Sequence, residues 1–147
     1  MSIRDLEPKI VWKYFYDLTQ IPRPSKKEER VLAYLVDFAK ENSLDWKQDE
    51  AGNIVIIKPA TAGKEEVPTV ILQSHVDMVP QKNSTVTHDF SKDPIDAYVD
   101  GNLVKARSTT LGADNGLGAA AALAVLADNT LVHGKIEALF TIDEEVG

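Results

Sequence analysis

Apolar residues recur at helical spacing through the first forty positions. After Pro8, a residue suited to the first position of a helix, apolar side chains at positions 10, 11, 14, 15 and 18 share one face. The prolines of the segment 21–25 (IPRPS) must end this helix. Ser25 and Glu28 then match a capping box, which predicts a second helix over residues 26–42 with apolar positions 31, 32, 35 and 38 on its buried side.

Three apolar runs predict β-strands, over residues 53–58 (NIVIIK), 69–74 (TVILQS) and 135–142 (KIEALFTI). The run 69–74 is apolar almost throughout, so we expect this strand to be buried on both faces, in a sheet between helix layers. Residues 95–106 predict a hairpin that turns at an Asp-Gly pair, and residues 115–128 predict an Ala-rich helix.

This order of helices and strands predicts an α/β fold, a three-layer sandwich with a mixed sheet between helices. The 147 residues are enough for one domain with a hydrophobic core. Because the chain ends at Gly147, two residues after the acidic pair that follows the last predicted strand, we expect residues 1–147 to be a truncated piece of a longer protein.

Composition excludes several kinds of partner and site. The net charge of −7 argues against binding to nucleic acid or to an anionic membrane surface. No apolar run is long enough to span a membrane, and the first residues lack the pattern of a signal peptide. Without cysteine, any metal must be held by His, Asp and Glu, and the absence fits a cytoplasmic protein.

His75 and Asp77 stand two residues apart, directly after the predicted strand 69–74. In extended backbone their side chains point to the same side, so the carboxylate can accept one ring N–H and leave the other nitrogen free for a metal. The alternative is a turn with a capping aspartate and a solvated histidine. The pair by itself favours that alternative.

The glycine-rich run 111–118 (LGADNGLG) precedes the predicted Ala-rich helix and has three interpretations. It can be a phosphate cradle at a helix N-terminus, an ordinary N-cap formed by Asp114 or Asn115, or a loop whose Asp114 bridges two metals. The run lacks the Lys-Ser/Thr of a P-loop and does not match G-x-G-x-x-G. Taken alone, it favours the N-cap.

Three adjacent carboxylates, Asp143, Glu144 and Glu145, follow the predicted strand 135–142. They repel one another unless the loop is solvated or a cation offsets their charge. In extended backbone Glu144 and Glu145 face opposite ways, so both reach one cleft only if the backbone twists locally.

Two of these three clusters follow the carboxyl end of a predicted strand, and the third begins a helix. Open α/β sheets bind ligands at such ends, so the clusters are expected to converge on one cleft. An imidazole and several carboxylates suit zinc, manganese or cobalt. No single cluster establishes a site, but the ordered set indicates one.

Four runs resemble one enzyme family. They are IPRPSKKEE (21–29), SHVDMVPQKN (74–83), RSTTLGADNGLGAA (107–120) and TIDEEVG (141–147). Together they resemble the Xaa-His dipeptidases, also called aminoacyl-histidine or cytosol non-specific dipeptidases. These belong to the co-catalytic di-zinc metallopeptidases that include carnosinase and carboxypeptidase G. The resemblance covers nearly the whole chain and implies the N-terminal portion of a metallopeptidase catalytic domain.

The resemblance also implies a role for each candidate residue. His75 is expected to bind one metal, and Asp77 to orient that histidine. Asp114 is expected to bridge both metals and to be followed by a cis peptide bond. Glu144 is the expected general base, and Glu145 the expected ligand of the second metal. His88 and His133 are expected to be solvated and not to bind metal.

The implied activity is hydrolysis of dipeptides by a metal-bridging water, with two divalent ions, zinc above all and manganese or cobalt as alternatives. Related enzymes that act as aminoacylases or carboxypeptidases, and a non-catalytic binding module with the same fold, remain alternatives. The family's remaining metal ligands and its lid domain, through which the full-length protein is expected to form a homodimer, lie beyond Gly147. We therefore expect these 147 residues alone to be inactive and to bind metal weakly.

Overall fold

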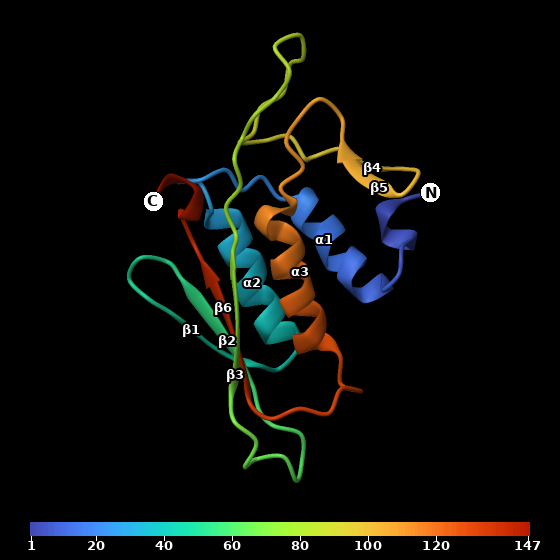
Figure 1. Ribbon diagram of the computed structural model, residues 1–147. Helices are drawn as coiled ribbons and strands as arrows, with labels where there is room; N and C mark the ends of the chain where they lie inside the picture. Colours follow the sequence, from blue (N-terminus) through green and yellow to red (C-terminus); the bar gives the residue numbers. More distant parts are fainter.

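The computed structural model describes residues 1–147 (Figure 1). Its helices and short 3-10 turns are η1 (Ile3–Asp5), α1 (Lys9–Thr19), α2 (Glu29–Glu41), α3 (Ala113–Ala127) and η2 (Glu144–Val146). Its strands are β1 (Asp45–Gln48), β2 (Ile54–Lys58), β3 (Val70–His75), β4 (Ala97–Asp100), β5 (Leu103–Ala106) and β6 (Ile136–Thr141). No helix combines the length and the apolar character needed to cross a bilayer.

Four of the strands form a mixed sheet in the order β1-β2-β6-β3. Strand β6 pairs antiparallel with β2 and parallel with β3. Strands β4 and β5 form a separate hairpin, whose turn contains Gly101 with a φ of 58°. The predicted mixed sheet and the predicted hairpin are both confirmed.

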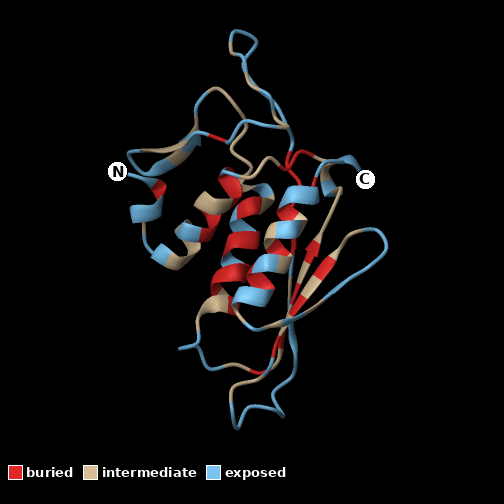
Figure 2. Ribbon diagram, turned by 180° about the vertical axis from the view of Figure 1, so that it is seen from behind, coloured by how far each residue is buried: buried red, intermediate tan, exposed pale blue.

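The helices pack on the sheet and enclose the hydrophobic core. Helix α2 contacts β1 and β2, helix α3 contacts β3 and β6, and helix α1 packs against α3. Every second residue of β2 and β6 is buried toward the helices, whereas the residues between them are only half-buried (Figure 2). The α/β class is therefore confirmed, and residues 1–147 contribute helices to one face of the sheet.

The first half of β3 differs from the prediction. Val70 and Ile71 are 52% and 62% exposed, and burial is complete only at the end of the strand, at Ser74 and His75. Since β3 is the last strand in the sheet order, its outer edge has no neighbour among these residues. The expectation that the strand is buried on both faces is wrong for this half, because an apolar composition does not distinguish an edge strand from a central one.

The predicted capping box is also wrong. Helix α2 begins at Glu29, three residues later than expected, and Glu28 at its N-cap forms no side-chain capping bond. Ser25 instead donates its hydroxyl hydrogen to Asp77, and the Glu28 carboxylate accepts the backbone N–H of Asp143. Both side chains therefore bond partners far away in the sequence and not the N–H groups at the start of α2. Buried polar groups need a hydrogen-bond partner, and here the fold supplies those partners outside the helix.

Strand β1 was not predicted. Its four residues (DWKQ) are mostly exposed and carry no alternating apolar pattern. It exists because its backbone pairs with β2, from Asp45 opposite Ile57 to Gln48 opposite Ile54. Pairing with a well-defined neighbour can impose strand geometry on a segment whose own sequence does not indicate it.

Candidate metal centre

The sheet topology brings the first and third clusters together. Strands β3 and β6 are parallel neighbours, and His75 pairs with Thr141 at their carboxyl ends. The segment after β6 therefore begins beside His75. Helix α3 packs on both strands, and its first turn lies at the same end. The predicted convergence at the strand ends is confirmed (Figure 1).

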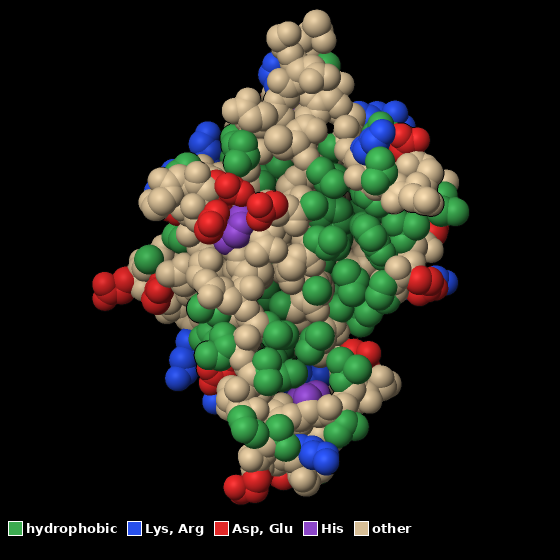
Figure 3. Space-filling view, viewed as in Figure 1, with side chains coloured by type: hydrophobic (Ala, Val, Ile, Leu, Met, Phe, Trp, Pro, Cys, Tyr) green, Lys and Arg blue, Asp and Glu red, His purple; other side chains and the backbone are tan.

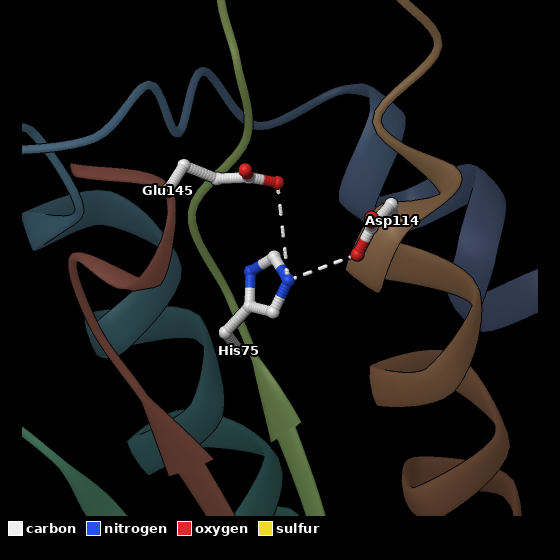
Figure 4. Close-up of side chains that lie close together, drawn as sticks. All are labelled: His75, Asp114 and Glu145. Atoms are coloured by element: carbon white, nitrogen blue, oxygen red, sulfur yellow. Dashed lines mark hydrogen bonds and ion pairs between the residues drawn. The ribbon is translucent and has the colours of Figure 1, made fainter. Parts of the chain in front are cut away.

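The two ring nitrogens of His75 face different carboxylates: Nδ1 faces Asp77, and Nε2 faces three others. His75 is only 7% exposed, and its Nδ1 is 3.1 Å from both the backbone oxygen and the Oδ1 of Asp77. Its Nε2 is 3.0 Å from Asp114 Oδ1 and 3.9 Å from Glu145 Oε1 (Figure 4). Glu144 Oε2 lies 3.7 Å from the same nitrogen. The histidine is not solvated in a turn, and with Nδ1 donating to Asp77 the Nε2 lone pair faces the carboxylates.

Asp77 is fully buried and joins two of the clusters. Its Oδ2 accepts the Ser25 hydroxyl at 2.6 Å and the Glu145 N–H at 3.1 Å. Its Oδ1 accepts the Glu144 N–H at 3.2 Å and faces His75. Burial acts to raise the pKa of Asp77, but these hydrogen bonds and the adjacent imidazole outweigh it and hold the pKa below its usual range. Asp77 therefore stays ionised and orients both His75 and the glutamate pair.

The backbone twist that would aim both glutamates into one cleft is present. Asp143 has a left-handed φ of 55°, and η2 follows it, so the backbone is not extended at Glu144 and Glu145. Both glutamate side chains then approach His75. The third carboxylate, Asp143, turns the other way and is bonded by the backbone N–H and the ammonium of Lys26, at 2.9 and 3.0 Å.

Asp114 reaches the site from a non-helical first turn of α3. Its φ and ψ are −91° and 105°, and the Asp114–Asn115 peptide bond is cis, as the resemblance implied. The helix N-cap is Gly112, which has no side-chain capping bond. The side chain of Asp114 is 86% exposed and contacts His75, so the interpretation of this run as an ordinary N-cap is wrong.

His75, Asp114 and Glu145 can offer one ligand atom each within 4.8 Å of one another. Two ligands each about 2 Å from a tetrahedral zinc lie roughly 3.3 Å apart, close to the 3.0 Å that separates His75 Nε2 from Asp114 Oδ1. Burial acts to lower the pKa of His75, but the contact with Asp114 and the charges of Asp77 and Glu144 raise it above its usual value. That negative field attracts a divalent cation as well as a proton, and Figure 3 shows the acidic side chains gathered around a histidine.

The other two histidines lie outside this group. His133 holds its Nδ1 2.6 Å from the oxygen of Gly134, and His88 packs on Phe90 with ring centroids 4.5 Å apart. Neither belongs to the group formed by His75, Asp114 and Glu145. The expected solvation of His88 is wrong for one atom, because its Nε2 is buried.

Two contributors from the IPRPS segment, one half-buried and one buried, were not predicted as part of the site. They are Ser25, which bonds Asp77, and Arg23, which bonds the backbone oxygens of Val76 and Gly112. A signal for them exists in the sequence. Two prolines in four residues exclude helix and sheet there, so the polar side chains between and after them need partners elsewhere in the fold.

Comparisons with known proteins agree with this geometry. Residues 71–147, which carry all three clusters, match the peptidase family M20/M25/M40. The chain is 54% identical to the cytosol non-specific dipeptidase of Escherichia coli over 146 residues, 99% of this chain and 30% of that protein. The aminoacylhistidine dipeptidase of Vibrio alginolyticus superposes with a TM-score of 0.98 at 51% identity, over 100% of this chain and 30% of that one.

A more distant structure shares the fold. A Bacillus subtilis protein described as a dinuclear metal-binding peptidase of the M20 family matches with a TM-score of 0.57 at 16% identity, over 92% of this chain and 35% of that one. The chain spans about 30% of the length of the two dipeptidases it resembles. Because the family match covers more than half of the chain and includes every candidate ligand, the chain belongs to peptidase family M20/M25/M40.

Proposed function

We propose that these residues form part of the catalytic domain of a metal-dependent dipeptidase. The observation that carries the proposal is His75, whose Nδ1 faces the buried Asp77 while its Nε2 faces three carboxylates. This is the carboxylate–histidine arrangement that prepares an imidazole for a metal. We assign the activity to a polypeptide of the relatives' length, of which these residues form about 30%.

In this proposal His75, Asp114 and Glu145 hold divalent cations, with Asp114 as the ligand shared by two of them. Nitrogen and carboxylate donors suit zinc best, and manganese and cobalt are also compatible. Such cations would polarise the scissile carbonyl and lower the pKa of a water molecule. Asp77 binds no cation and instead keeps His75 in the tautomer that presents Nε2.

Glu144 is the general base of the proposed reaction. Its carboxylate is 58% exposed and lies 3.7 Å from His75 Nε2, while its backbone N–H is bonded to Asp77. The backbone is therefore fixed and the carboxylate is accessible to an attacking water. Glu144 takes the proton of that water and passes it to the leaving amine, a role worth about 10²–10⁴ in rate.

The substrate class follows from the two most similar named relatives, a cytosol non-specific dipeptidase and an aminoacylhistidine dipeptidase. We propose dipeptides, including those with a C-terminal histidine, a cytoplasmic location, and a homodimer formed through a domain outside these residues. A hydrolysis panel of unmodified dipeptides, β-alanyl-histidine and an acetylated amino acid, run on the polypeptide of the relatives' length, tests the substrate class. Cleavage of the acetylated amino acid alone would exclude a dipeptidase.

The metal centre is tested on the polypeptide of the relatives' length, because residues 1–147 alone are expected to bind metal weakly. Co²⁺ titration, followed by the visible absorption of the bound ion, should give binding that His75→Ala abolishes. The matched control is His133→Ala, because His133 lies outside the ligand group and should leave Co²⁺ binding unchanged. Equal Co²⁺ binding by wild type and His75→Ala would contradict the proposed centre.

A further inference from the structure

One segment contacts all three parts of the candidate metal centre. We call residues 21–28 the bracing segment. The side chain of Arg23 bonds the backbone beside the first two clusters, and Ser25 bonds Asp77. Its Lys26 and Glu28 bond Asp143 at the third cluster. The segment is thus the common neighbour of loops that lie far apart in the sequence.

Arg23 makes the connection between the segments that carry His75 and Asp114. Its Nη1 donates to the oxygen of Val76 at 2.9 Å, and its Nη2 donates to the oxygen of Gly112 at 2.7 Å. Val76 immediately follows His75, and Gly112 lies two residues before Asp114. The two nitrogens of one planar group therefore tie together the backbones from which two of the candidate ligands project.

The guanidinium is deeply buried, with only 1% of Arg23 exposed, and its Nε has no hydrogen-bond partner. Burial lowers the pKa of Arg23 to about 10, opposed by the charge of Asp77, so the group remains protonated at neutral pH. Taking a charge out of water is costly, and for this reason even a buried ion pair is often no more stabilising than well-packed apolar residues of similar volume. Stability of the core is therefore a weak reason for a cation at this position.

The glycine-rich run is shaped around this guanidinium. A Cβ on Gly112, which has a φ of 74°, would lie 2.7 Å from Arg23 Nη2. A Cβ on Gly116 would overlap the same nitrogen. Both glycines flank Asp114, so the absence of their side chains lets Arg23 approach the backbone on either side of the bridging candidate. This explains the glycines without a phosphate ligand.

We propose that Arg23 is a positioning residue of the metal centre, which sets the separation between His75 and Asp114 by bonding the backbones of both segments. The inference rests on the proposed function, because it needs the centre to bind metal. Arg23 does not contact the ligand side chains, so its effect passes through the two carbonyl groups. Lysine is expected to replace it poorly, since Arg23 bonds the two carbonyls through two separate nitrogens of a rigid planar fork, whereas an ammonium has only one nitrogen on a flexible stem.

The test is Co²⁺ binding by the polypeptide of the relatives' length with the substitution Arg23→Lys, which keeps the charge and removes the fork. We expect the Kd for Co²⁺ to rise about 10–100-fold, the usual effect of changing a residue that orients metal ligands. The visible absorption of bound Co²⁺ should also change, because that absorption depends on ligand geometry. Thermal unfolding followed by circular dichroism establishes that the variant is folded.

A matched control is Lys58→Met. Lys58 is also a buried cation that bonds two backbone oxygens, those of Val125 and Asp128, but at the opposite end of α3. Lys58→Met should leave the Co²⁺ spectrum and the Kd for Co²⁺ unchanged, even where it lowers thermal stability as much as Arg23→Lys does. An unchanged Kd in Arg23→Lys, or an equal loss in Lys58→Met, would overturn the positioning role.

Gly116→Ala keeps the proposal testable if Arg23→Lys does not fold. A purely structural role of Gly116 predicts a loss of thermal stability, because the added methyl group overlaps buried side chains, but it predicts unchanged Co²⁺ binding by the folded chain. The positioning role predicts a several-fold weaker Kd, because the methyl group displaces Arg23 Nη2. Unchanged binding contradicts the inference alone, whereas absence of Co²⁺ binding by the wild-type polypeptide of the relatives' length overturns the proposed metal centre and the inference with it.

Discussion

Asp77→Asn is the substitution for which the structure allows the clearest magnitude. The two carboxylate oxygens of Asp77 meet four donors: the His75 ring and the Glu144 N–H at Oδ1, and the Ser25 hydroxyl and the Glu145 N–H at Oδ2. An amide turns one of the oxygens into a donor. In either orientation its NH₂ group faces a backbone N–H, which cannot reverse its role.

At least one buried N–H therefore loses its acceptor, and one buried donor without a partner costs about 1–3 kcal/mol. Loss of the charge on Asp77 weakens the remaining bonds as well, because bonds to an ionised acceptor are about twice as strong as neutral ones. We expect the free energy of unfolding of the metal-free chain to fall by about 2–4 kcal/mol. The Kd for Co²⁺ should rise by about 10–100-fold, since His75 loses its orienting partner.

Urea unfolding followed by circular dichroism measures the first quantity, and Co²⁺ titration measures the second. The matched control is Asp49→Asn. Asp49 also accepts several bonds, from the N–H groups of Gly52 and Asn53 and from the Asn53 amide, but it is exposed and distant from the site in the sequence. Asp49→Asn should lose much less stability than Asp77→Asn, because water replaces lost partners at an exposed site. Equal losses in the two variants would refute the role given to burial at Asp77.

Three further predictions concern the same centre. Ser25→Ala should lower the free energy of unfolding in urea by about 1–2 kcal/mol, because it removes a donor to buried Asp77. The helical signal in circular dichroism should not fall, because Ser25 caps no helix, and a shortened helix would contradict this. Co²⁺ at 100 times its Kd should stabilise the wild-type chain by about 2.7 kcal/mol and leave His75→Ala unaffected; equal stabilisation would indicate binding elsewhere. Glu145→Gln should weaken Co²⁺ binding by about tenfold or more. Glu144→Gln should change the Kd for Co²⁺ by less than about threefold and should abolish hydrolysis by the polypeptide of the relatives' length. Weaker Co²⁺ binding in Glu144→Gln than in Glu145→Gln would exchange the two roles.

The elements that could be predicted are those whose burial repeats with a local period. Helix α1, strand β2 and strand β6 each place apolar residues at the spacing of their own geometry, and the structure has them within two residues of the expected bounds. Strand β1 has no such pattern and depends on pairing with β2. For the same reason the edge position of β3 could not be inferred, because it depends on which strands lie beside it.

The types of residue at the site were likewise readable from the sequence. His75, Asp114 and the glutamate pair stand at predicted ends of strands and at the start of a helix, and as a set their chemistry indicated a cation as the ligand. Their arrangement was not readable. Extended backbone would have separated Glu144 from Glu145, and only the left-handed residue before η2 turns both toward the histidine.

Thus the sequence by itself determined the main elements, the candidate ligands and, through four motifs, the family. Tertiary structure alone decided the partners of Ser25, Glu28 and Arg23. Locally, Ser25 and Glu28 suit a helix cap, but the buried Asp77 and the N–H of Asp143 compete for them across more than fifty residues. A buried polar group without a partner costs more than an unmade cap at an exposed helix end, where water can take its place. Which partner each side chain bonds depends on distances that exist only in the folded chain, so no local pattern of residues predicts it.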